Sequence, residues 1–168
     1  MSNSSKLLIR EARLEDLPAI QSIYEPYVLE TTVSFEYESP SLDDFANRLQ
    51  TIQAEYPFLV AQLEDTVVGY AYGHRYQERK AFDYTCEISI YLASSSQGYG
   101  IGHSLYQELE KQLKKAGFIL LVAAITADND SSLSFHQRNG FTLAGRLNKV
   151  GYKFGRWLDL ILMTKEIN

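Results

Sequence analysis

The sequence predicts a mixed α/β or α+β fold, and three observations support this prediction. Some segments alternate apolar and polar side chains as strands do, whereas others repeat apolar side chains every three or four residues, as amphipathic helices do. The two kinds of segment alternate along a chain of 168 residues, a length that favours one compact domain. No linker rich in proline, glycine or serine and no internal repeat interrupts them. We therefore expect a single domain over residues 1–168.

The first half of the chain predicts a strand, two helices and a β-hairpin. Apolar residues at helical spacing after an acidic turn predict the first helix. Ser41 and Asp44 match a capping box, so the second helix is expected to begin there, and Pro57 ends the region. The polar turn at Glu64 and Asp65 separates two strand-like segments, as in a hairpin. The expected ranges are Leu7–Glu11, 17–28, 42–52, Phe58–Leu63 and Val67–Tyr72.

The clearest strand pattern lies in Tyr84–Leu92, where side chains alternate between two faces. One face carries the polar or amphipathic side chains of Thr85, Glu87, Ser89 and Tyr91, and the other carries Cys86, Ile88, Ile90 and Leu92. Glu87 therefore shares a face with Ser89 and Tyr91, whereas Cys86 is expected in the core.

Two helices and three strands are expected after this segment. Apolar residues spaced by four predict a helix from Ile101 that stops at Gly117, since glycine suits the left-handed position after a helix. Phe118–Ile125 is apolar throughout and predicts a fully buried strand. A short helix then runs from a cap at 128–130 to Asn139 and is closed by Gly140. Two strands follow on either side of Phe154 and Gly155.

Charge and cysteine content exclude several classes of protein. The net charge of −5, without a basic stripe, argues against binding to nucleic acid. The longest apolar segment is far shorter than the roughly 20 residues that cross a bilayer, and the N-terminus lacks the apolar core of a signal peptide. Cys86 is the single cysteine and the three histidines are scattered, so we expect no disulfide and no metal site. A cytoplasmic location is expected.

A glycine-rich loop between the fourth strand and the next helix is the main functional motif. Glycines there allow a ligand to approach the backbone, and the amides of the following helix start suit a phosphate group. A Walker A loop would need Lys where His103 stands, and a dinucleotide fingerprint starting at Gly98 would need Gly there. What remains is Gln97, two residues, Gly100, one residue and Gly102. The alternative is a strand-to-helix turn that binds no ligand.

This loop resembles the pyrophosphate loop of the GNAT acyltransferase superfamily, in which Gln or Arg precedes two spaced small residues. The likeness is closer to the phosphinothricin acetyltransferase branch and runs from about Ile9 to Met163. It is carried by Thr31–Phe35, Tyr56–Ala61, Ala81–Glu87 and Val150–Asp159. The resemblance implies a twisted mixed sheet flanked by helices, with acyl-CoA as cosubstrate. It also implies direct transfer of acetyl from acetyl-CoA to an amine, without an acyl-enzyme.

The same resemblance implies roles for individual residues. Glu87 corresponds to the family's base, and His136 stands where many members carry a tyrosine that donates a proton to the leaving thiolate. Whether His136 is such an acid or serves only packing is left open. The implied cofactor-binding residues are Ile90, Tyr91, Leu92, Gln97, Gly98, Tyr99, Gly100, Ile101, Gly102, His103 and Asn129. His74 and His103 are expected at the surface or in loops, and neither is expected to have a catalytic role.

The acceptor pocket is expected to hold cationic groups, because phosphinothricin and similar amino acids are anionic. The implied acceptor-binding residues are Phe35, Arg75, Arg79 and Ser89. Methionine sulfoximine and methionine sulfone are further candidate acceptors, and the physiological amine is left open. The alternatives are a peptide or polyamine acetyltransferase and a CoA-binding module without turnover. Family members commonly dimerise, so a homodimer is also expected.

Overall fold

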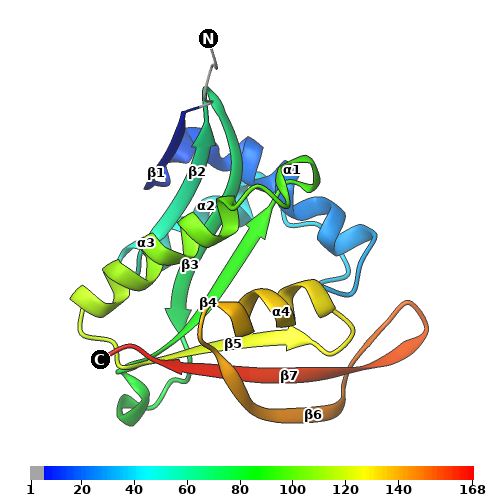
Figure 1. The fold of residues 1–168 in the computed structure, drawn as a ribbon. Helices are drawn as coiled ribbons and strands as arrows, with labels where there is room; N and C mark the ends of the chain where they lie inside the picture. The colour runs from blue at the N-terminus through cyan, green and yellow to red at the C-terminus, as the bar shows by residue number, and fades with distance from the viewer. Residues whose placement is uncertain (1–5) are drawn as a thin grey trace. The chain divides into compact units, whose positions relative to one another are not determined.

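The computed structural model describes residues 6–168, so the first five residues of the expected domain lie outside it. Over these residues it contains seven strands and four α-helices (Figure 1). The strands are β1 (Leu7–Glu11), β2 (Phe58–Leu63), β3 (Thr66–Arg75), β4 (Thr85–Leu92), β5 (Leu120–Thr126), β6 (Thr142–Lys153) and β7 (Arg156–Glu166). The α-helices are α1 (Leu17–Leu29), α2 (Leu42–Gln53), α3 (Ile101–Lys115) and α4 (Asp130–Arg138). This confirms the expected mixed fold.

The strands form a mixed sheet in the order β1-β2-β3-β4-β5-β7-β6. β1 and β2 are antiparallel, and so are β2 and β3, β5 and β7, and β6 and β7. β4 and β5 are parallel, and their register places Glu87 beside Val122. A parallel pair requires a crossover connection, which here contains α3.

Chain contacts divide the molecule into two compact units, each built from three segments. Among the described residues, the first unit contains 6–25, 40–73 and 89–113, and the second contains 26–39, 74–88 and 114–168. The expectation of one domain over residues 1–168 stays a prediction.

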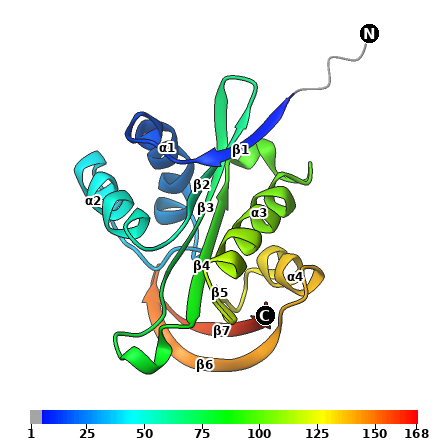
Figure 2. The ribbon, with the colours of Figure 1, turned by 90° about the vertical axis from the view of Figure 1, so that its left-hand side faces the viewer.

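In the first unit, α1 and α2 lie on one side of the strands and α3 lies on the other (Figure 2). Successive side chains of β4 point to opposite faces of the strands, and each face is covered by helices. The Tyr91 ring packs edge-on against Tyr24 of α1, with centroids 5.1 Å apart. On the opposite face, a Cβ atom at Gly69 would lie 2.5 Å from the Leu92 side chain and 3.2 Å from Leu105 of α3. Glycine at 69 therefore permits close packing of β3 against α3.

In the second unit, α4 packs on β5, and β5, β7 and β6 continue as an antiparallel ribbon (Figure 1). The core of this unit is formed by buried apolar side chains that include Leu121, Ala123, Ile125 and Phe141. The strand predicted as fully buried over Phe118–Ile125 begins only at Leu120, and Ile119 is 43% exposed. That part of the prediction is wrong, because an apolar sequence does not reveal where a strand enters the sheet.

Local signals that depend on neighbouring residues were predicted correctly. The hydroxyl of Ser41 accepts a hydrogen bond from the Asp44 amide at 3.1 Å, and the Asp44 carboxylate accepts one from the Ser41 amide at 3.0 Å. Gly117 and Gly140 adopt φ values of 96° and 91°, the left-handed conformation expected after a helix. Within residues 6–168, no helix has both the length and the apolar character needed to cross a membrane.

Candidate functional site

The glycine-rich loop in the first unit enters α3 through two left-handed backbone positions. Gly98 has a φ of 86° and Gly100 a φ of 78°, and no atom lies within 4 Å of a Cβ built at either position. Backbone conformation rather than crowding therefore requires glycine there. The α3 ladder begins where the Ser104 amide donates to the Gly100 carbonyl at 3.1 Å. The amides of Ile101 and Gly102 thus lie in the first turn, where no intrahelical acceptor exists.

The other predicted cofactor residues of this unit surround the same connection. Gln97 is extended and precedes the glycines, Tyr99 is largely exposed, and His103 is in the first turn of α3. Ser89, Ile90, Tyr91 and Leu92 form the end of β4 that leads into the loop. The side chains of Tyr91 and Leu92 take opposite faces, so their backbone rather than their side chains is available for a common ligand contact along the strand.

Glu87 in the second unit makes a close contact with a histidine that the sequence pattern did not indicate. Its Oε2 atom lies 2.8 Å from Nε2 of His74, and the two side chains are 26% and 31% exposed. His74 lies in the strand β3 and not in a loop, and its side chain is partly exposed. The neighbouring Cys86 is buried, as predicted, and burial raises the pKa of its thiol to about 12. Cys86 therefore stays uncharged beside Glu87 at neutral pH.

His136 is buried in α4, with its ring edge-on to Phe141. Burial lowers the pKa of the imidazole, and a hydrogen bond to the Ser132 carbonyl only partly opposes this. Nδ1 lies 2.7 Å from that carbonyl oxygen, so Nδ1 carries the proton. The neutral ring then has a proton acceptor, not a donor, at Nε2.

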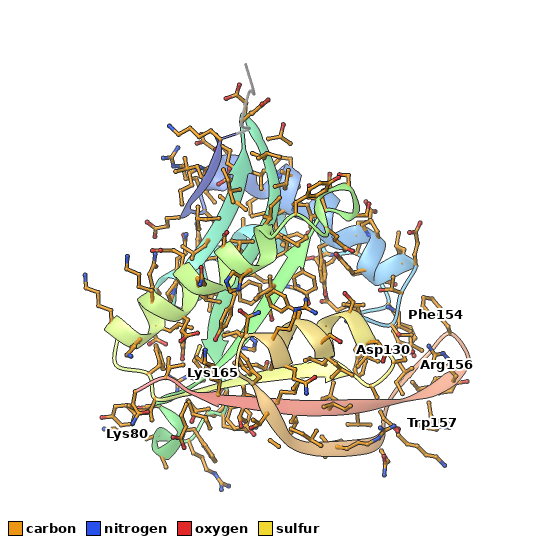
Figure 3. The ribbon with its side chains drawn as sticks, viewed as in Figure 1. Lys80, Asp130, Phe154, Arg156, Trp157 and Lys165 are labelled. Carbon is orange, nitrogen blue, oxygen red and sulfur yellow. The ribbon has the colours of Figure 1, made fainter. Side chains whose placement is uncertain are left out.

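Asn129 is the N-cap of α4, and its side-chain oxygen accepts a hydrogen bond from the Ser132 amide at 3.2 Å. It also lines a pocket of about 310 Å³. Beside it, Arg156 binds Asp128 at 2.6 Å, and this contact lowers the pKa of the Asp128 carboxyl. Figure 3 shows Arg156 with Phe154 and Trp157 around the turn between β6 and β7.

Phe35 belongs to a loop that the β6–β7 hairpin holds in place. A Cβ atom at Gly151 would lie 2.7 Å from the Phe35 ring, so glycine at this position lets the ring lie against β6. Lys153 of the same strand is 3% exposed. Its ammonium group donates to the carbonyls of Val28, Thr31 and Ser34 at 2.6, 2.8 and 2.7 Å. The position of the loop therefore depends on a buried cation.

Arg75 and Arg79, the two predicted acceptor-binding cations, have different surroundings. The guanidinium group of Arg75 lies 3.2 Å from the Asp83 carboxylate. Arg79 is exposed and precedes a short 3₁₀ helix, Lys80–Phe82. The structure therefore neutralises part of the positive charge that was expected at Arg75.

The structure gathers the predicted residues within each unit. Ser89, Ile90, Tyr91, Leu92 and the loop Gln97–His103 belong to the first unit, and Phe35, Arg75, Arg79, Glu87, Asn129 and His136 belong to the second. Sequence reasoning missed His74 and Lys153. The hydrogen-bond partners of Lys153 lie far away in the sequence, so no local pattern could have identified them. Among residues 6–168, no group of three His, Cys, Asp or Glu residues is arranged to hold a metal ion.

Comparison with known proteins identifies the class. The family described as acetyltransferase (GNAT) domain matches residues 9–162. The chain therefore belongs to the GNAT acetyltransferase family and is an N-acetyltransferase. This confirms the resemblance inferred from the glycine loop and its flanking segments.

Individual relatives refine the comparison. The chain is 39% identical to an L-methionine sulfoximine/L-methionine sulfone acetyltransferase of Pseudomonas paraeruginosa, over 95% of this chain and 94% of that protein. It is 37% identical to a phosphinothricin N-acetyltransferase of Alcaligenes faecalis, over 95% and 82%. A crystal structure of a phosphinothricin acetyltransferase from Sinorhizobium meliloti in complex with acetyl-CoA has a TM-score of 0.93 and 36% identity, over 96% of this chain and 89% of that one.

Proposed function

We propose that this protein transfers the acetyl group of acetyl-CoA to the amino group of a small amino acid or an analogue such as phosphinothricin, methionine sulfoximine or methionine sulfone. The observation that carries the proposal is the loop before α3, where Gly98 and Gly100 adopt left-handed conformations. Relatives named for acetylation of these acceptors, and one that contains acetyl-CoA, support it.

The loop Gln97–His103 is assigned to the coenzyme's diphosphate. The first-turn amides of Ile101 and Gly102 belong to a helix of 15 residues, whose N-terminus favours an anion. The backbone of Ile90–Leu92 is assigned to the pantetheine arm and to the oxyanion. Asn129 is assigned to the coenzyme as well, although its side-chain oxygen already caps α4. Each assignment rests on the family likeness together with these local geometries.

The reaction needs a base because the acceptor's amino group is mostly protonated at neutral pH. Glu87 is assigned this role, which is typically worth about 10²- to 10⁴-fold in rate. The freed amine attacks the thioester carbonyl, the C–N bond forms, and the C–S bond breaks. The departing sulfur takes a proton from the attacking nitrogen, so one proton goes to Glu87 and one to the thiol.

The surroundings of His136 favour a role in packing over the role of general acid. The neutral ring keeps its proton on Nδ1, which donates to Ser132, and burial lowers its pKa, so Nε2 has no proton to give. An aliphatic thiol titrates near about 8.5, so the thiolate can depart without a dedicated acid.

The acceptor is assigned to Phe35, Arg75, Arg79 and Ser89. The two arginines suit an acidic amino acid and disfavour a polyamine, since like charges repel. A peptide acetyltransferase and a CoA-binding module without turnover are the alternatives to be separated by experiment.

The test is a screen of acetyl-CoA with amino acids, their sulfoximine, sulfone and phosphinate analogues, peptides and polyamines, read by release of free thiol. We expect the analogues to be the best acceptors and Glu87→Gln to lower kcat about 10²-fold or more while acetyl-CoA still binds. Glu78→Gln, which removes an exposed carboxylate from the preceding segment, is the control. Turnover that is unchanged in Glu87→Gln would place the base elsewhere. Binding of acetyl-CoA without thiol release for any acceptor would favour a binding module.

The family likeness also supports a homodimer in the cytoplasm as part of this proposal. Sedimentation equilibrium of the purified protein measures the first, and fractionation of the native host measures the second.

A further inference from the structure

The ion pair of His74 and Glu87 joins the proposed base to a side chain that has no assigned role. The two residues come from neighbouring strands, β3 and β4, and Nε2 meets Oε2 at 2.8 Å. This distance is that of a short charge-assisted hydrogen bond. Both side chains are about a quarter to a third exposed, so the pair is open to solvent on one side.

The second ring nitrogen of His74 also faces an oxygen. Nδ1 lies 3.2 Å from the carbonyl oxygen of Arg75, which can only accept a hydrogen bond. A neutral imidazole carries one proton and can donate to only one of these two acceptors. Both contacts are satisfied when one further proton lies between Nε2 of His74 and Oε2 of Glu87. The observed geometry is therefore that of a pair holding a shared proton.

We propose that His74 is a positioning residue for Glu87, which it orients through Oε2 and with which it shares the proton that Glu87 removes from the acceptor's ammonium group. This proposal rests on the proposed function, because it takes Glu87 as the base. Before the transfer, neutral His74 donates from Nδ1 to Arg75 and turns the Nε2 lone pair toward the carboxylate. The ammonium proton passes to Oε2 of Glu87 and is then held between Oε2 and Nε2, which is the protonation state that fits the 2.8 Å contact, while the freed amine attacks the thioester.

His74 provides a second acceptor for the proton that Glu87 removes, because Nε2 and Oε2 are close enough to hold it together. Two coupled groups release their protons as a pair and not separately. Nearby ionisable groups are themselves engaged or uncharged: Arg75 pairs with Asp83, and the Cys86 thiol is neutral. β5, which runs beside Glu87, consists of Leu, Val, Ala, Ile and Thr.

The test compares His74→Gln with the native enzyme in the pH dependence of kcat at saturating acceptor. Glutamine can still hydrogen-bond to Glu87 but cannot share a proton, so the acidic limb of the profile should move to lower pH by about one unit or more. We expect kcat at pH 8 to fall about tenfold and the KM for acetyl-CoA to stay unchanged. A role in packing alone would lower kcat without moving the limb, and that outcome would overturn the proposal.

Two further measurements separate this proposal from the assignment of Glu87. If His74 acts through Glu87, the double variant His74→Gln/Glu87→Gln should be no slower than Glu87→Gln, whereas multiplied losses would contradict the coupling. If His74→Gln keeps the native pH dependence of kcat and Glu87→Gln is inactive, the proposed role of His74 is wrong but Glu87 remains the base. An active Glu87→Gln would refute the base itself. In NMR spectra of histidine rings recorded below the acidic limb of the native profile, a His74 Nε2–H signal should be present in the native protein and weakened by exchange in Glu87→Gln. Its absence from the native protein under these conditions would contradict the shared proton.

Discussion

At the scale of single residues, local surroundings decide which groups carry charge. Burial opposes ionisation of Asp16, but hydrogen bonds from Arg10 and from the Arg13 amide outweigh it and lower the pKa of the carboxyl below 3.8. Burial alone dominates at Cys86 and His136, and it keeps both uncharged near neutral pH. The Glu87 carboxylate keeps partial access to solvent and gains a histidine partner. Ionisable groups of this chain therefore differ in their partners and in their access to solvent from one position to the next.

Replacement of Gly100 tests the loop by charge alone. Gly100→Asn and Gly100→Asp impose the same left-handed strain, which Asn and Asp tolerate better than most residues, but only Asp repels a diphosphate. We expect saturating acetyl-CoA to raise the Tm of the native protein and of Gly100→Asn by about 5 °C or more and to leave that of Gly100→Asp unchanged. Thermal unfolding with and without acetyl-CoA measures this. An equal rise in the Asp variant would show that the loop does not contact the coenzyme.

Asp16→Asn tests a buried ion pair that holds the N-terminal strand. Arg10 donates to both carboxylate oxygens of Asp16 at 2.8 Å, and Asp16 is 5% exposed. We expect the variant to lose about 2 kcal/mol of unfolding free energy at pH 7. Because the folded pKa lies below the unfolded value, the contribution is complete above about pH 4 to 5 and disappears as the pH falls further. Urea unfolding at pH 7 and pH 3 should show a difference that shrinks in acid. If the difference in unfolding free energy between the native protein and Asp16→Asn were the same at both pH values, the substitution would act through packing and not through the lost charge.

At the scale of elements, the β6–β7 hairpin anchors a loop that it does not adjoin in sequence. Lys153 binds three carbonyls at and after the end of α1, and Arg156 binds Asp128, which also accepts a hydrogen bond from Thr32 at 3.1 Å. Burial lowers the pKa of Lys153, whereas Glu36 raises it. The hairpin thus holds the segment that presents Phe35, and its stability is coupled to the proposed acceptor site.

Lys153→Met removes this anchor while keeping a long side chain. Three carbonyls then lose their donor in a buried site, so we expect a loss of about 3 kcal/mol in unfolding free energy. The KM for the acceptor should rise more than the KM for acetyl-CoA, because the loop carries Phe35. Urea unfolding and steady-state kinetics measure these effects, and Lys114→Met on the exposed side of α3 is the control. Equal changes in both KM values would contradict the link between anchor and acceptor.

At the scale of the whole molecule, the order of helices and strands was predictable because each element has its own periodicity. The capping box at Ser41, the hairpin at Glu64 and Asp65, and the helix ends at Gly117 and Gly140 depend on a few adjacent residues. The ends of the Phe118–Ile125 strand were not predictable, because its limits depend on pairing with β4 and β7. Glu87 could be proposed from its place before the loop, but its histidine partner could not.

The sequence by itself determined the class of fold, the glycine loop and the family, since spacing and residue type suffice where the interactions are local or the motif is contiguous. Only the tertiary structure decided which distant groups meet: His74 with Glu87, Lys153 with the end of α1, and the Nδ1 proton of His136 with the Ser132 carbonyl. These contacts depend on strand register, burial and the direction of each side chain. Such properties belong to the folded chain and leave no periodic trace in the order of its residues.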